Sequence, residues 1–445
     1  MINKSEYIKQ KMPLVFIMIF LALFSFVQAS ADSFDSLLDI GPTVNNKMRF
    51  LPSLDNPDPP QQANSIISVR MADSLPDNFV PSERNTVSSA DSKCPVYIFF
   101  DNKDDAGIMY FYTAGDRIVM NSDSSLLFSG YPALVDISAV ADWDASCITS
   151  MYAMFGGAKS LPDALALKSW DTSNVTDMRF MFAGALSLKY IDVSNWNTHK
   201  VTSMKNMFQV GENYMGNGQL SEILGLGNWD VSNVTDMTCM FYGAGQMTEY
   251  DVSNWNVSKV ESMNHMFCDN FKLRALDLSN WDVSSVKTMY CMFDDAQSLR
   301  TIGDVSHWNT ANLIDAGGWL NYAESFVGNN SGCLDLSGWN TSNLKTVGEM
   351  FLRTKIRTID LSGWTFDSII NTKWEGAGQG IYYEYGNGSG KEVQGFGQMF
   401  KKTPNLIAVY ISQSGLDSFN TAVEREVNIE EMWADSKCTG FTVKK

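Results

Sequence analysis

Hydrophobic and polar residues alternate in a fixed order that recurs along most of the chain. The clearest copy is WDTSNVTDMRFMF at 170–182, in which Trp is followed by polar residues and then by Val, Met, Met and Phe. Six further copies, each with Trp twelve residues before Phe, lie at 143–155, 196–208, 229–241, 255–267, 281–293 and 339–351. Self-similarity at such a period is typical of repeat proteins whose units stack into a solenoid.

Each unit contains one segment before the Trp and one after it, and the two have different periodicities. Before the Trp, apolar residues stand two apart, as in Ile191 and Val193, which predicts a short β-strand. After the Trp, the apolar residues of 175–182 follow one face of a helix, which predicts a short α- or 3₁₀-helical turn carrying the Met-Phe pair. A second short strand at 175–176 is the alternative for this segment.

The Phe position of the repeat indicates the number of coils. Aromatic anchors at this position are Phe128, Phe155, Phe182, Phe208, Phe241, Phe267, Phe293, Phe326, Phe351, Phe400 and Trp433. We therefore expect a solenoid of about eleven coils, built from short parallel β-strands and short helical turns. Because stacking places like residues above like, the Trp, Met and Phe side chains are predicted to fill the interior.

The regions outside the repeat differ from it in composition. Residues 32–93 are rich in Pro, Asn, Asp and Ser, which predicts an extended or partly disordered leader. Residues 94–123 contain two aromatic and β-branched runs around a turn-rich centre, which predicts a β-hairpin that caps the first coil. The repeat domain is expected at 124–440, followed by a C-terminal tail at 441–445.

A secretory signal peptide is predicted at 1–31. Lysines precede an apolar run at 14–27, and cleavage is expected after Ala29 or Ala31. The apolar run is too short for a stable membrane span. We therefore expect an exported chain, secreted or held at the cell surface, with no transmembrane span after cleavage.

The repeat text W-D/N-x-S-N-V-T-x-M-x-x-M-F, preceded by an I-D-V-S type strand, resembles the repeat of BspA-like leucine-rich-repeat bacterial surface proteins. The resemblance covers about residues 94–440. It implies a leucine-rich-repeat-like solenoid displayed outside the cell, with adhesion or ligand binding as its role and no enzymatic activity. It supplies no site residues.

The net charge narrows the class of partner, and the cysteine content bears on disulfide bonding. The formal net charge of −17 argues against nucleic acid or an anionic membrane as the main partner, because both require a basic surface. The seven cysteines are an odd number, so at least one thiol has no disulfide partner within the molecule. Their irregular spacing favours small buried core residues over a disulfide framework.

Three interruptions of the repeat, at 211–222, 311–325 and 371–398, are predicted to emerge as loops, which in solenoids often form the binding face. The second and third interruptions both lie between the Trp and the Phe of their coils, so we expect both loops to leave the solenoid at the same edge. Aromatic and acidic residues in these two loops form the predicted ligand contact patch. The patch consists of Trp319, Tyr322, Trp374, Glu375, Tyr382, Tyr383, Glu384, Tyr385 and Phe396. The alternative is that the rings fold back and cover the side of the solenoid.

No metal or cofactor is predicted. The recurring methionines suit a core ladder better than a copper site. Cys239, His265 and Cys291 share one repeat position, with Cys268 nearby, but the two outer thiols would stand about 10 Å apart, which disfavours one zinc ion and a disulfide. Recurring aspartates such as Asp192 are expected to cap turns, with calcium binding as the alternative.

No catalytic constellation emerges, because His199, His265 and His307 have no nucleophile motif around them. We therefore expect a non-enzymatic, adhesin-like protein whose edge loops bind an extracellular protein or glycan of a host, matrix or cell surface. An envelope structural or self-assembling protein is the alternative. A carbohydrate-binding or carbohydrate-active protein is less favoured.

Overall fold

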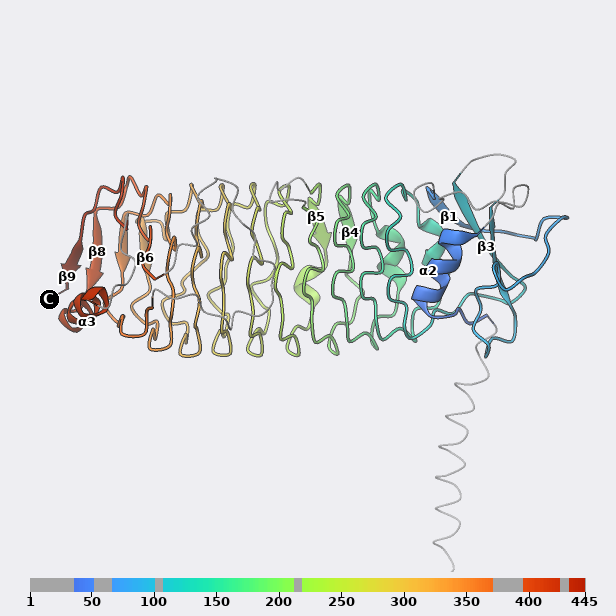
Figure 1. Cartoon of the computed structure of the whole chain (residues 1–445), viewed down its shortest axis with the longest axis horizontal. Helices are drawn as coiled ribbons and strands as arrows, with labels where there is room; N and C mark the ends of the chain where they lie inside the picture. The colour runs from blue at the N-terminus through green and yellow to red at the C-terminus, as the bar shows by residue number, and fades with distance from the viewer. Residues whose placement is uncertain are drawn as a thin grey trace, which may run out of the picture.

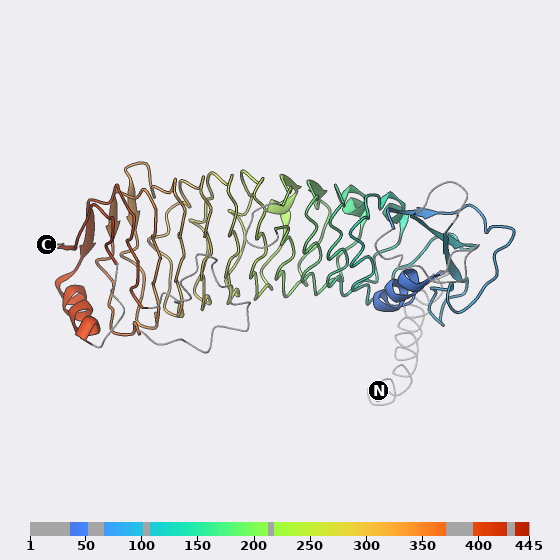
Figure 2. The same ribbon diagram turned by 45° about the horizontal axis from the view of Figure 1, so that its top comes forward.

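The computed structural model describes residues 36–51, 66–100, 107–211, 218–370, 395–424 and 432–444. The chain forms a long rod in which successive turns of backbone stack along one axis (Figure 1). A wider cap formed by the N-terminal part lies at one end, and the helix α3 (Gln413–Glu424) and the strand β9 (Phe441–Val443) lie at the other (Figures 1 and 2). The predicted signal peptide at 1–31 falls outside the described residues.

A ladder of parallel β-bridges joins neighbouring coils through the residue seven positions after each Trp. Asp123 at the equivalent point of the first coil begins this ladder, and its members are Asp123, Ser150, Asp177, Ser203, Asp236, Ser262, Thr288, Asp315 and Thr346. Each bridge fixes the register between two coils, so equivalent residues form columns along the rod.

Regular strands occur in only some of the coils. Strand β4 (Tyr190–Asp192) pairs in parallel with β5 (Glu222–Leu224). Near the C-terminal end, β6 (Cys333–Asp335), β7 (Thr358–Asp360), β8 (Ala408–Ile411) and β9 form a parallel four-stranded sheet in that order. Elsewhere the expected strands reduce to isolated bridges such as that between Ala275 and Thr301.

Three coils have a 3₁₀ helix immediately before the Trp, and in the coil of Trp229 this helix follows the strand β5. These helices are η2 (Ser138–Asp142), η3 (Leu165–Ser169) and η4 (Leu226–Asn228). Their sequences SAVAD, LALKS and LGN contain few β-branched or aromatic residues, so strand propensity is low there.

The segment that carries the Met-Phe pair is a series of turns, so the helical turn predicted over 175–182 is wrong. In the coils from Trp143 to Trp339, the residue ten positions after the Trp has a positive φ, which takes the backbone out of a right-handed helical path. This left-handed column contains Ala153, Phe180, Asn206, Cys239, His265, Cys291, Gly318 and Glu349. The alternative, a second strand at 175–176, is not formed either, and the neighbouring residue Asp177 forms isolated β-bridges.

The interior contains the predicted Trp, Met and Phe columns, and their burial confirms that part of the prediction. Phe182 stacks between Phe155 and Phe208 with ring centroids 5.5 Å and 5.6 Å apart. Seven tryptophans also donate Nε1–H to a backbone carbonyl of the preceding coil: Trp170, Trp196, Trp255, Trp281, Trp308, Trp339 and Trp364. The indole therefore fills the core without leaving its N–H unpaired.

The N-terminal cap contains the predicted hairpin, formed by β2 (Val96–Phe100) and β3 (Ile108–Thr113). The strand β1 (Ser68–Met71) adds to β3 in parallel. The helix α2 (Gly41–Phe50) packs Val44 and Met48 into the core.

The prediction of an extended or partly disordered leader at 32–93 is therefore wrong for 36–51 and 66–93. Short apolar patches, including Val44 and Val69, have enough hydrophobic surface to join the cap because the first coil offers an uncovered end. None of the helices in the described ranges has both the length and the hydrophobicity that a membrane crossing requires.

Candidate functional site

The predicted loop at 311–325 is instead a regular coil. Leu320 stands twelve residues after Trp308 and takes the Phe position, and its N–H donates to the carbonyl of Met350 in the next coil at 3.0 Å. Trp319 occupies the position of the second Met and is 0% exposed. Its ring centroid lies 6.2 Å from that of Trp308 and 5.1 Å from that of Trp339. Trp319 is thus a core residue, and its prediction as a ligand contact is wrong.

The insertion at the third interruption consists of 371–394 alone. Ile370 N–H donates to the carbonyl of Lys345 at 3.1 Å, and Val347 N–H donates to the carbonyl of Gly395 at 3.0 Å. In the other coils the residues equivalent to Ile370 and Gly395 are consecutive. The coil therefore closes on both sides of the insertion with its usual hydrogen bonds.

Phe396 is also a core residue rather than a ligand contact. It is 0% exposed, and its ring centroid lies 5.5 Å from that of Phe366 and 5.1 Å from that of Phe419. Its prediction as part of a loop is wrong because the regular coil resumes at Gly395. The remaining predicted contacts, Trp374, Glu375, Tyr382, Tyr383, Glu384 and Tyr385, lie outside the described residues.

Tyr322 is the described member of the predicted patch that reaches the surface, and it is half-buried. The guanidinium carbon of Arg353 lies 4.4 Å from the centre of its ring, a cation–π contact. Arg353 Nη1 also forms an ion pair with Glu324 Oε1 at 3.1 Å. We refer to Tyr322, Glu324 and Arg353 as the edge cluster.

Sequence analysis missed Glu324 and Arg353. Tyr322 and Arg353 each stand fourteen residues after a Trp, so the corrected register of the repeat would have placed them in adjacent coils. The assignment of Phe326 as an anchor hid this relation, because Phe326 instead occupies the column of Leu273 and Leu299.

The first interruption, at 211–222, contains the start of a strand as well as inserted residues. Glu222 begins β5, and Gln219 N–H donates to the carbonyl of Leu186 at 2.9 Å. Residues 212–217 lie outside the described residues. The described part of this interruption therefore continues the coil stack.

The column with Cys239, His265 and Cys291 is buried. Burial raises the pKa of the Cys239 thiol to about 12, and it lowers the pKa of His265 to about 4. Burial also raises the pKa of Cys291 well above its usual value, so these thiols are protonated at neutral pH and are poor metal ligands. Among the described residues, no three His, Cys, Asp or Glu side chains converge to hold a metal ion.

The recurring aspartates cap turns as predicted. Asp192 Oδ1 accepts a hydrogen bond of 3.0 Å from Ser194 N–H, and Asp360 Oδ1 accepts one of 3.0 Å from Ser362 N–H. The pKa of Asp192 is lowered, and the largest cause is its hydrogen bond with Lys168, whose Nζ lies 2.7 Å away. These contacts stabilise the corner of each coil.

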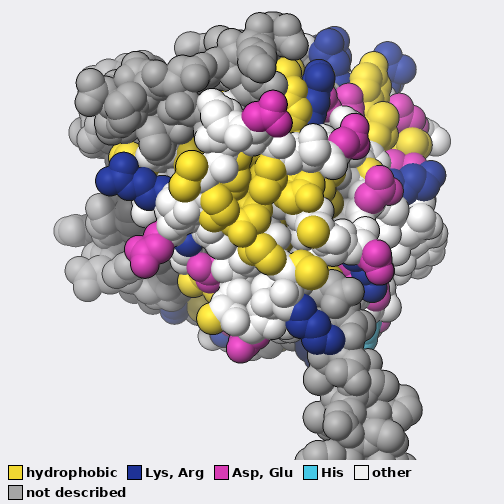
Figure 3. Space-filling model, turned by 90° about the vertical axis from the view of Figure 1, so that its right-hand side faces the viewer, with side chains coloured by type: hydrophobic (Ala, Val, Ile, Leu, Met, Phe, Trp, Pro, Cys, Tyr) yellow, Lys and Arg dark blue, Asp and Glu magenta, His cyan; other side chains and the backbone are white. Residues whose placement is uncertain are grey.

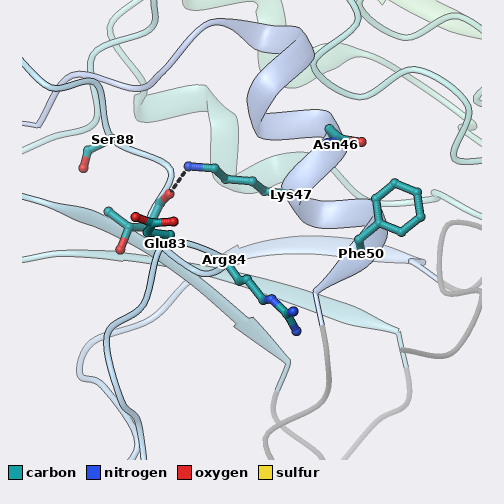
Figure 4. Close-up of a pocket in the computed structure, with 7 residues that line it drawn as sticks. Asn46, Lys47, Phe50, Glu83, Arg84 and Ser88 are labelled. Atoms are coloured by element: carbon teal, nitrogen blue, oxygen red, sulfur yellow. Dashed lines mark hydrogen bonds between the residues drawn. The ribbon is translucent and has the colours of Figure 1, made fainter. Parts of the chain in front are cut away.

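A cavity of about 650 Å³ lies in the cap, between α2 and the segment that follows β1 (Figure 4). Lys47, Phe50, Glu83 and Arg84 contribute to its lining. Lys47 Nζ is already engaged, because it donates to the carbonyl of Thr86 at 2.7 Å. The lining carries charges of both signs and thus favours no particular class of ligand.

The end face of the cap has hydrophobic side chains gathered at its centre, with charged residues of both signs around them (Figure 3). On the hairpin, Val96 and Ile98 face the coil stack and belong to the main core. Tyr97 and Phe99 alternate with them and instead contact Phe79, with ring centroids 5.3 Å and 5.8 Å away. This second side of the sheet is the aromatic face of the cap.

Comparison with known families gives one description for the repeat region. A family profile described as "Mycoplasma protein of unknown function, DUF285" matches residues 123–223, 214–333 and 303–375. These overlapping matches follow the coil stack from its first coils to the coil that carries the insertion, and they cover more than half of the chain. No curated protein sequence matches the chain.

Proposed function

The chain belongs to the DUF285 family of Mycoplasma proteins of unknown function, and we propose that it is an exported, non-enzymatic binding protein. In this proposal the coil stack is a leucine-rich-repeat-like solenoid, similar to BspA-like surface proteins. The solenoid acts as a scaffold that presents one edge to a protein or glycan of a host, a matrix or a cell surface.

The observation that carries the proposal is the closure of the coil around 371–394. The hydrogen bonds of Ile370 and of Gly395 complete the coil, so the inserted residues are not needed to bury its core. The insertion contains Trp374 and a run at 382–385 with three tyrosines. Tyr and Trp supply contact area with few rotatable bonds, which is why they are frequent at binding surfaces.

The edge cluster extends the proposed contact surface. Tyr322, Glu324 and Arg353 lie in the two coils that precede the coil with the insertion. Arg353 N–H donates to the carbonyl of Lys401, a residue of the coil that carries the insertion. Arginine and tyrosine held in a cation–π contact present both charge and apolar area to a partner.

The contacts and burial of the histidines favour a non-catalytic role. His199 Nδ1 lies 2.7 Å from Asn197 Oδ1, and the His265 ring packs edge-on against Tyr290 at 5.3 Å. Burial keeps His265 neutral at pH 7 because its pKa is about 4. Neither contact is that of a general base with a nucleophile.

Deletion of 371–394, with Ile370 joined to Gly395, tests the proposal on arrays of glycans and extracellular matrix proteins. We expect the full chain to bind a ligand on these arrays and the deletion variant to lose at least tenfold in affinity. A matched control replaces 371–394 with a Gly/Ser segment of equal length. Full binding by the deletion variant or by the control, with the fold intact, would refute the proposal. Protease shaving of intact cells tests export.

Self-assembly is the second candidate, and the aromatic face of the cap is the observation that favours it. Phe79 is half-buried although it packs on Tyr97 and Phe99. Sedimentation velocity over a hundredfold range of concentration tests this role. Association that disappears in Phe79→Ser supports assembly through the cap, and a monomer at all concentrations contradicts it.

A further inference from the structure

Three polar side chains of successive coils, Asp269, Asp294 and Asn321, are buried at one edge of the rod. Their exposed fractions are 2%, 0% and 3%. Asp269 N–H donates to the carbonyl of Asp294 at 2.8 Å, and Asp295 N–H donates to the carbonyl of Asn321 at 2.9 Å. Asp294 and Asn321 share one repeat position, thirteen residues after Trp281 and Trp308, and Asp269 stands at the next position of the preceding coil. The backbones of neighbouring coils are about 4.8 Å apart.

Oxygen atoms of this cluster lack hydrogen-bond partners. They are Asp269 Oδ2, Asp294 Oδ1, Asp294 Oδ2 and Asn321 Oδ1. All four atoms are hydrogen-bond acceptors. One of them is the amide oxygen of Asn321, so the cluster contains a neutral ligand type as well as carboxylates. A buried acceptor without a donor is strongly unfavourable, and native proteins satisfy such groups with donors, water or ions. The aspartates that cap turns, such as Asp192, do have N–H donors.

The carboxyl groups of the cluster lack a cationic partner, although Tyr242 and Cys268 hydrogen-bond to Asp269. The backbone N–H of Asp295 interacts with Asp294. Within the described ranges, neither Asp269 nor Asp294 forms an ion pair with a Lys or Arg. Asp295 accepts a hydrogen bond from Gln297 Nε2 at 3.0 Å, and Glu349 adds further negative charge near Asp294. The nearby Arg353 is paired with Glu324. Two ionised carboxyl groups would therefore leave two negative charges in a buried site.

We propose that Asp269, Asp294 and Asn321 bind one hard divalent cation, calcium in particular, between three adjacent coils. Carboxylate and amide oxygens are the ligands that calcium takes in proteins. The amide is a necessary third ligand, because no three acidic, His or Cys side chains converge in the described chain. The cation joins the coils that begin at Trp255, Trp281 and Trp308, and this role is independent of the proposed ligand binding.

The first test measures calcium binding by the full chain after treatment with EDTA. Titration calorimetry and thermal unfolding at pH 8 are run with CaCl₂ or MgCl₂. We expect one calcium ion per chain at this site and a Tm increase of about 3–5 °C at saturation. We expect a smaller shift with magnesium, because magnesium requires stricter octahedral geometry. No shift with calcium would refute the site.

Asp294→Asn and Asp282→Asn form a matched pair for the second test. Asp294→Asn is expected to weaken calcium binding at least tenfold. Asp282 is an exposed acid of the same coil that caps Ser284 N–H at 3.0 Å, and Asn fills the equivalent position at Asn256. Asp282→Asn is therefore expected to keep the calcium response. An equal response in both variants would show general screening of the acidic surface and refute the site.

Asn321→Asp keeps the proposal testable if Asp294→Asn does not fold. It adds a third carboxylate to the site, so we expect tighter calcium binding and a lower Tm without calcium. An unchanged calcium affinity contradicts the proposal. A proton shared by the two carboxyl groups is the competing explanation. It predicts that calcium has no effect at pH 8 and that Asp294→Asn raises the Tm, and this outcome also refutes the site.

Discussion

The indole Nε1 of Trp281 donates a hydrogen bond of 2.9 Å to the carbonyl oxygen of Val252, one coil earlier. The same contact recurs at six other tryptophans. It explains why Trp recurs at a buried position where Phe would fill similar space. Each of these indoles gives a carbonyl of the preceding coil a second donor, beside a backbone N–H of that coil, and packs in the core at the same time.

Trp281→Phe tests the contribution of this hydrogen bond. The carbonyl of Val252 keeps the backbone N–H of Trp255 as a donor at 3.2 Å but loses the indole donor, so we expect a loss of about 0.5–1.5 kcal/mol in the free energy of unfolding beyond the effect of ring size. The control is Trp229→Phe, because Trp229 has the same WDVS context but its Nε1 has no partner. Equal destabilisation in the two variants, measured by urea unfolding, would contradict this role.

Trp319→Ala and Tyr322→Ala separate a core residue from a surface residue. Trp319 is completely buried among other aromatic rings, so its truncation is expected to cost about 3–5 kcal/mol of stability. Tyr322 loses mainly a cation–π contact, so its truncation is expected to cost about 1 kcal/mol. The Tm values of the two variants provide the measurement, and a larger effect at Tyr322 would contradict the assigned positions.

The sequence predicts the interior well because burial imposes a strict period. Trp, Met and Phe return at fixed offsets, and residues such as Met178 and Phe182 are completely buried. The coil at Trp308 was misassigned because Leu320 replaces Phe and an aromatic residue six positions later took its place in the count. Stacking preserves the spacing of twelve residues rather than the aromatic identity of the residue at that position.

The turn conformation was not predictable in the same way. Cys239, His265 and Phe180 have positive φ values, yet only Gly and, less often, Asn signal such a conformation in a sequence. Hydrogen bonds to the next coil hold these residues, as when Cys239 N–H donates to the carbonyl of Asn264 at 2.8 Å. Contacts between coils, rather than local preference, therefore determine this part of the fold. The same limit applies to the edge cluster, whose members come from different coils.

Asp315 predicts a specific dependence of stability on pH. Burial raises its pKa to about 7, above the value of the unfolded chain. The folded state therefore holds the proton more tightly, so the stabilisation is complete below pH 4 and is lost as the pH rises through about 7. Asp315→Asn keeps an acceptor for Gly317 N–H, which donates to Asp315 Oδ1 at 2.9 Å, but it does not titrate.

Urea unfolding of the native chain and of Asp315→Asn at pH 5 and pH 8 measures this effect. We expect the native chain to lose up to about 3 kcal/mol more than the variant between these pH values. Asp335→Asn is the control, because Asp335 is exposed and caps Ser337 N–H at 2.9 Å. Identical pH profiles for the native chain and Asp315→Asn would contradict the titration of Asp315.

Deletion of 371–394 also makes a prediction about stability. Ile370 and Gly395 become consecutive, as their equivalents are in the other coils, so we expect a folded chain whose Tm changes by less than about 3 °C. Deletion of Thr346 alone is the contrasting variant. It removes a bridge residue and shifts Val347 and Met350 out of register, and we expect a much larger loss of stability. Circular dichroism melting compares the two variants.

The bridge ladder has a consequence for how such a chain changes over generations. Every internal coil presents the same backbone donors and acceptors to the coil before it and to the coil after it. A duplication or loss of one repeat in the gene therefore leaves both new neighbours compatible. The rod can change its length by single coils while the cap and the C-terminal sheet stay the same, so the distance between the two ends of the rod is a heritable trait that needs no new fold.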